Sequence, residues 1–196
     1  MFNSATRVLF SGNGNQQVMG WELNVDEIEI NKPSGVLHMH SDMRIRGNLT
    51  MINGQMNFNG FDLYLNTDNL GELQYQGGAW LNLHHLHYHH LPNTLTDLNA
   101  SFPFGDTFQG GIRKIQLLGA SPRGNLSIRK IEIPGANWDP MFNDHDGTPI
   151  LYQLNSYFEF SSTSTSTNDI EMRISAENLI VDQVDDLRIV SNGGAA

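Results

Sequence analysis

The stretch VLHMHSDMRIRGNLTMINGQMNFNGFDLYL, residues 36–65, decides the fold class of this chain. Apolar and polar side chains alternate in short runs, and glycines interrupt the runs at Gly47, Gly54 and Gly60. Alternation with a period of two places successive side chains on opposite faces of a β-strand. Each glycine allows a bend or bulge at which the facing can reset. The stretch therefore predicts short β-strands that share one buried face.

Similar runs continue along the chain, and no helix longer than two turns is predicted. We expect an all-β fold of glycine-punctuated short strands, either a β-solenoid-like stack or a β-sandwich, with little or no helix. Residues 1–196 are expected to form a single domain, with a candidate subdivision at the loop-like segment 99–111. Residues 32–35 predict a turn, and residues 1–12 are a candidate docking arm. The predicted core residues are Met43, Ile45, Leu49, Met51, Met56, Phe58, Phe61 and Leu63.

Composition narrows the classes of partner. The formal net charge is −10, which disfavours binding to nucleic acid and to anionic membrane surfaces. No apolar run reaches the roughly 18 residues of a transmembrane helix, so no membrane insertion is expected. The N-terminal residues lack the pattern of a signal peptide. The chain has no cysteine, so disulfides and thiolate chemistry are excluded.

Histidines form the most conspicuous chemical cluster, with five of the eight in residues 84–90. On a strand, His85, His87 and His89 would share one face, and His38 and His40 would form a second same-face pair. Neutral imidazoles at this spacing can bind zinc, copper or nickel. The sequence leaves two interpretations open: a metal site at these five residues, or histidines that stack and hydrogen-bond on an edge or interface strand.

A second candidate metal site lies in the irregular segment that contains Asp139, Asp144 and Asp146. Oxygen ligands in a loop suit calcium, but the spacing does not follow the EF-hand pattern, and a solvated acidic loop is the alternative. The sequence contains no G-x-S-x-G elbow, P-loop or dinucleotide fingerprint. We therefore expect no enzymatic activity, no catalytic residues and no cofactor other than a divalent metal ion.

The glycine-punctuated alternation is accompanied by an echo, in which Arg46-Gly47-Asn48-Leu49 recurs as Arg123-Gly124-Asn125-Leu126. With the richness in Thr, Ser and Asn, this pattern resembles β-rich bacterial filament or fimbria subunits and phage tail components. The resemblance implies a self-assembling structural subunit, a homo-oligomer or polymer, at the cell surface or outside the cell. Two alternatives remain: a carbohydrate-binding or adhesin module that contacts glycans or cell surfaces, and a histidine-rich metal-binding protein.

Overall fold

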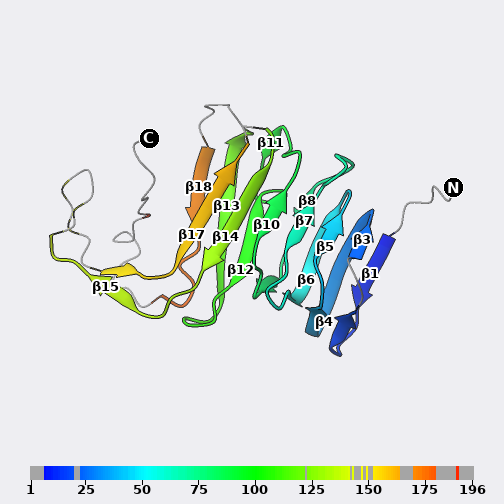
Figure 1. Cartoon of the computed structure of the whole chain (residues 1–196), viewed down its shortest axis with the longest axis horizontal. Coiled ribbons are helices and arrows are strands. Elements are labelled where there is room, and N and C mark those ends of the chain that lie inside the picture. The colour runs from blue at the N-terminus through cyan, green and yellow to red at the C-terminus, as the bar shows by residue number, and fades with distance from the viewer. Residues whose placement is uncertain are drawn as a thin grey trace.

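The computed structural model describes residues 7–19, 23–121, 123–141, 143, 147, 149, 152–163, 170–179 and 189. The chain winds into a β-solenoid whose ten-stranded and six-stranded sheets enclose a common apolar core (Figure 1). This confirms the all-β expectation and selects the solenoid-like stack. None of the described residues forms a helix, so none forms one long and apolar enough to cross a membrane.

Eighteen strands make up the described fold. They are β1 (Arg7–Ser11), β2 (Gln16–Val18), β3 (Leu23–Val25), β4 (Glu27–Met39), β5 (Met43–Ile45), β6 (Leu49–Asn57), β7 (Leu63–Leu65), β8 (Leu73–Tyr75), β9 (Ala79–Leu81), β10 (Leu86–Tyr88), β11 (Thr94–Leu95), β12 (Ser101–Gly105), β13 (Ile112–Ala120), β14 (Leu126–Ile131), β15 (Ala136–Trp138), β16 (Tyr152–Leu154), β17 (Tyr157–Ser162) and β18 (Ile170–Ile174).

Each coil places one strand in the six-stranded sheet and then one or two strands in the ten-stranded sheet. In the six-stranded sheet β3, β5, β7 and β10 are parallel neighbours, and successive partners lie 20, 20 and 23 residues apart. The aligned residues are Leu23, Met43, Leu63 and Leu86. Residues one coil apart therefore lie side by side, and a side chain's neighbours come from adjacent coils.

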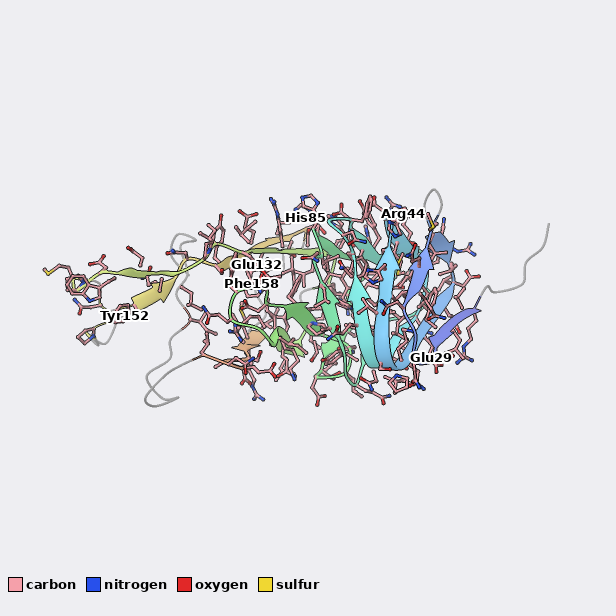
Figure 2. All side chains as sticks on the ribbon, turned by 90° about the horizontal axis from the view of Figure 1, so that it is seen from below. Glu29, Arg44, His85, Glu132, Tyr152 and Phe158 are labelled. Carbon is pink, nitrogen blue, oxygen red and sulfur yellow. The ribbon has the colours of Figure 1, made fainter. Side chains whose placement is uncertain are left out.

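The C-terminal part of the fold is antiparallel. β13 pairs with β12 and β18, and β14 pairs with β10 and β17. The hairpin of β15 and β16 forms a separate two-stranded sheet that projects beyond the two main sheets (Figures 1 and 2). The solenoid therefore has two unlike ends.

The core follows the predicted alternation closely. Seven of the eight predicted core residues have fully buried side chains. Phe61 is only half-buried, because it lies after the turn at Gly60 and its N–H donates to the carbonyl of Phe58. The two largest fully buried side chains are those of Trp80 and Tyr88.

The segment 99–111 is only in part the loop that its proline and its glycines suggest, because residues 106–111 form a turn but residues 101–105 form a strand. It contains β12, all five residues of which are buried, and β12 pairs with β9 and β13. A strand buried on both faces has no alternating pattern, which is why the sequence did not reveal it.

Residues 32–35 do not reverse the chain either. β4 continues through them, and only its register with β6 shifts. Lys32 is fully buried there, and its Nζ donates to the carbonyls of Gly12 and Gly14 and to Gln16 Oε1 at 2.7–3.3 Å. The predicted turn is therefore an irregularity within β4. The ammonium group of Lys32 holds the connection between β1 and β2 against β4.

The N-terminal segment and the sequence echo also occupy unexpected positions. Residues 7–11 of the candidate docking arm form β1, which pairs in parallel with β4 of the same chain. The two echo copies lead into β6 and β14, which belong to different sheets, so the echo is not a repeat of the coil. Residues 1–6 lie outside the described part of the chain.

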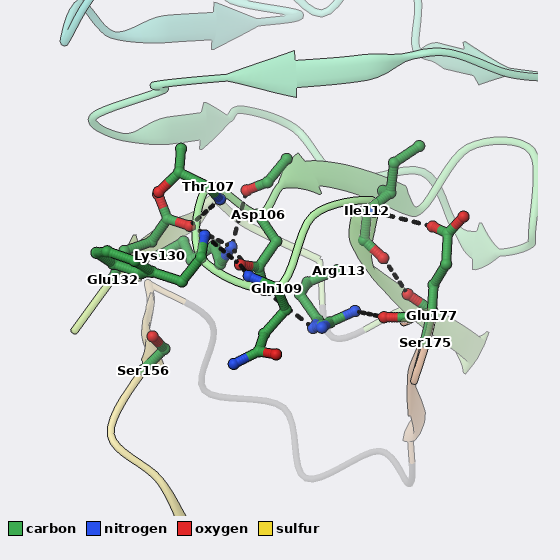
Figure 3. A network of polar contacts seen from close by, with 12 residues as sticks. Asp106, Thr107, Gln109, Ile112, Arg113, Lys130, Glu132, Ser156, Ser175 and Glu177 are labelled. Atoms are coloured by element: carbon green, nitrogen blue, oxygen red, sulfur yellow. Dashed lines mark hydrogen bonds and ion pairs between the residues drawn. The ribbon is translucent and has the colours of Figure 1, made fainter. Parts of the chain in front are cut away.

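A buried ionic network connects the last coil to the C-terminal strands (Figure 3). Asp106 Oδ2 lies 3.1 Å from Arg113 Nε and 3.5 Å from Lys130 Nζ, and all three side chains are 5–6% exposed. Lys130 also contacts Glu132, which accepts a hydrogen bond from the N–H of Thr107. Burial would raise the pKa of Asp106, but hydrogen bonds from backbone N–H groups and the two cations lower it.

Candidate functional site

The strongest candidate site lies on the outer face of the six-stranded sheet, where β7 and β10 begin. Leu63 and Leu86 are register partners and point into the core. The residues that precede them, Asp62 and His85, are therefore neighbours on adjacent coils. Tyr64 and His87 are the next pair on the outer face. The coil register, and not closeness in sequence, brings these groups together.

The Asp62 carboxylate is the centre of this cluster. Its Oδ1 lies 2.9 Å from His84 Nδ1 and 3.5 Å from His85 Nδ1, and its Oδ2 lies 3.7 Å from His87 Nε2. The Nδ1 atoms of His84 and His85 are 3.0 Å apart. Candidate ligand atoms of Asp62, His85 and His87 all lie within 4.8 Å of one another.

Backbone and ring contacts hold the cluster in place. The N–H of His85 donates to Asp62 Oδ1 at 3.0 Å, and the N–H of Asp62 donates to Asp42 Oδ1 at 3.0 Å. Tyr64 stacks on His87 with ring centroids 4.6 Å apart, and its hydroxyl lies 3.4 Å from Asp62 Oδ2. The Tyr64 side chain therefore orients both the Asp62 carboxylate and the His87 ring.

The electrostatics favour an ionised carboxylate beside a neutral imidazole. Burial would raise the pKa of Asp62, but the hydrogen bond with His84 and the nearby imidazoles lower it below its usual value. Burial and the neighbouring His84 lower the pKa of His85, and the Asp62 charge only partly opposes them. These are the protonation states in which both groups can bind a cation.

The five histidines predicted as ligands do not converge. His85, His87 and His89 lie along the outer face of the six-stranded sheet, and Leu86 and Tyr88 between them are buried. The ring of His89 is 6.3 Å from that of Tyr64, on the same strand face as His87 but outside the ligand group.

His38 and His40 lie elsewhere. His38 is on β4 in the ten-stranded sheet, between the buried residues Leu37 and Met39, so it belongs to the outer face of the other sheet. His40 follows that strand and is exposed. Neither belongs to the ligand group found among the described residues.

Sequence reasoning missed Asp62, which carries the site. A single aspartate after Gly60 and Phe61 has no local signal of ligation. Only an alignment of one coil with the next, 23 residues later, places it beside the histidines. His84 is also a neighbour of Asp62 that the strand pattern does not reveal, because β10 begins only at Leu86 and the ring of His84, before the strand, lies against Asp62.

The acidic loop is described only in part. Asp139 is half-buried, and its Oδ1 accepts a hydrogen bond from the N–H of Met141. Asp144 and Asp146 lie outside the described residues. The structure therefore leaves the predicted calcium site as a prediction.

A second surface feature is an open groove of about 660 Å³ along one corner of the solenoid. It follows the positions of Gly54, Gly78 and Gly105, and polar groups such as Asn82 and Glu177 line it. Its lining, within the described residues, includes no aromatic ring on which a sugar could stack. The groove therefore lends no support to the carbohydrate-binding alternative.

Comparison with known proteins found no matching family model, no similar curated protein and no similar solved structure.

Proposed function

We propose that this chain is a structural subunit that associates end to end with further copies of itself, in an extracellular filament, fimbria or surface assembly. The observation that carries the proposal is the open strand edge at the N-terminal end of the solenoid. Among the described strands, β1 and β2 pair only with β4, and β3 pairs only with β5. An unpaired strand edge offers backbone groups that can pair with another chain.

The opposite end supports the same proposal through its apolar surface. Trp138 and Tyr152 face each other across the projecting hairpin, at 59% and 69% exposure. Further exposed apolar side chains cluster on or near the C-terminal strands: Ile133, Met141, Leu154, Tyr157, Phe160 and Met172. Exposed apolar groups in such numbers are typical of an interaction surface.

Because the two ends differ, contact between them would be head-to-tail. A head-to-tail contact that does not close into a ring produces an open filament. A second copy of this chain is the partner that presents both surfaces, with the N-terminal edge of one copy against the C-terminal strands of the next.

Sedimentation velocity over a wide range of concentrations tests the proposal. We expect the mean mass of the wild-type protein to rise well above that of the 21.9 kDa chain as concentration increases. Leu9→Lys places a charge on β1, at a side chain that is 56% exposed, and should shift association to higher concentration. Leu98→Lys is the matched control, because Leu98 is 54% exposed but lies in a turn beside β8, where its carbonyl accepts a hydrogen bond from the N–H of Tyr75.

The control variant should associate like the wild-type protein. Equal association of all three proteins would remove the N-terminal edge from the proposal. A wild-type protein that stays monomeric at every concentration would contradict self-association as a whole.

A further inference from the structure

We propose that Asp62, His85 and His87, with His84 beside them, form a binding site for one divalent transition-metal ion, and that Zn²⁺ fits it best. The proposal is independent of self-association, because the site lies on the outer face of the six-stranded sheet and uses none of the sheet edges.

The distances between the candidate donor atoms carry the proposal. Zinc binds imidazole nitrogen and carboxylate oxygen at about 2.0–2.2 Å, so neighbouring donors in a tetrahedral site lie roughly 3.3–3.5 Å apart. Oδ1 of Asp62 and the Nδ1 atoms of His84 and His85 form a triangle with sides of 2.9, 3.0 and 3.5 Å. His87 Nε2 approaches the other carboxylate oxygen at 3.7 Å. Small rotations of these side chains would place four donors around one ion.

The donor set selects the class of ion. Three imidazoles and one carboxylate suit zinc, nickel, copper and cobalt, whereas calcium and magnesium require a shell of oxygen ligands. Four protein donors would fill a tetrahedral zinc site, as in structural sites, and a three-donor set would leave one position for water. The two forms differ in whether His84 binds the ion. His84 is the most exposed member of the group, so it is the ligand that water can replace.

The site also has the outer support that metal ligands require. Tyr64 contacts the Asp62 carboxylate through its hydroxyl and stacks on His87. The N–H of His85 fixes Asp62 Oδ1. Tyr64 is therefore a positioning residue, and such outer contacts typically contribute 10–100-fold to metal affinity.

A bound ion would join two adjacent coils. Asp62 lies at the start of β7, and the histidines lie at the start of β10, one coil further along the solenoid. A ligand that binds only the folded state stabilises it by RT ln(1 + [L]/Kd), an amount that grows with the free ligand concentration. Zinc should therefore raise the melting temperature as well as bind.

Calorimetric titration of the tag-free, chelator-treated protein with zinc chloride tests the proposal, with cobalt chloride absorption as a second measurement. We expect one equivalent of zinc per chain, a cobalt spectrum typical of tetrahedral nitrogen and oxygen ligands, and a higher melting temperature in zinc. The double variant His85→Gln/His87→Gln should lose at least about a hundredfold in affinity, since changes in outer contacts alone cost 10–100-fold.

Asp62→Asn provides a second variant that preserves the fold, because its amide oxygen can still accept the hydrogen bond from the N–H of His85. We expect it to weaken zinc binding by at least tenfold. His40→Gln is the matched control, since His40 is exposed and lies outside the group. Zinc affinity that is unchanged in both site variants, or that falls equally in the control, would overturn the proposal.

Discussion

Gly78→Ala tests the close approach of neighbouring coils, on which the solenoid depends. Gly78 has a φ of +102°, and a Cβ atom there would lie 2.2 Å from the carbonyl oxygen of Gly54 on the adjacent coil. A side chain at such a φ costs about 1–3 kcal/mol in backbone strain. Forcing extra volume into a packed site costs typically about 1–3 kcal/mol more. The expected loss in the free energy of unfolding is therefore about 2–6 kcal/mol.

Gly60→Ala is the matched control for this prediction. Gly60 also has a positive φ, of +87°, but a Cβ atom there would have no neighbour within 4 Å. Only the strain contribution of about 1–3 kcal/mol should remain. Urea unfolding followed by circular dichroism measures both variants against the wild-type protein. Equal losses for Gly78→Ala and Gly60→Ala would refute the close stacking of coils at this corner.

Three other predictions concern the core, the ionic network and the buried lysine. Phe58→Ala should lower the free energy of unfolding by about 3–5 kcal/mol, because Phe58 is fully buried. The same change at the half-buried Phe61 should cost clearly less. Equal losses in urea unfolding would contradict this prediction. The pKa of Asp106 is lowered in the folded state, so its charge stabilises the fold above the unfolded pKa near 3.8 and this contribution is lost as pH falls through the lower folded pKa. The stability gap between the wild-type protein and Asp106→Asn should therefore be constant from pH 7 to 5 and shrink below pH 4, and a gap that is flat to pH 3 would show that the ionised form is not preferred. Lys32→Met removes the donor to three oxygen acceptors. Amide hydrogen exchange in β1 and β2 should therefore become faster, while exchange in β6 stays the same. Unchanged exchange in β1 and β2 would show that Lys32 does not hold the connection between them.

The sequence was sufficient to predict the strands in which buried and outer side chains alternate. Met43 and Ile45, or Leu63 and Leu65, have one buried face and one outer face, so their periodicity is visible locally. β12 has no such periodicity because both of its faces are buried. The burial of Lys32 was equally hidden, because its partners are two carbonyls and one side-chain oxygen that lie 16–20 residues away.

The candidate site shows the same division between local and long-range information. The alternation of His85, His87 and His89 on one face follows from strand geometry alone. The contribution of Asp62 depends on the register between β7 and β10. Successive coils are 20 and 23 residues long, so no constant repeat length in the sequence predicts that register. The separation of His38 from His87 likewise follows from their places in two different sheets.

The most direct test of end-to-end assembly is electron cryomicroscopy of the pure protein at high concentration. The proposal predicts elongated particles of repeating subunits, in which β1 of one copy lies against the C-terminal strands of the next. Neighbouring strands across that contact should be about 4.8 Å apart, as within a sheet. Particles that remain single subunits at the highest concentration, or pairs joined through two identical surfaces, would contradict it.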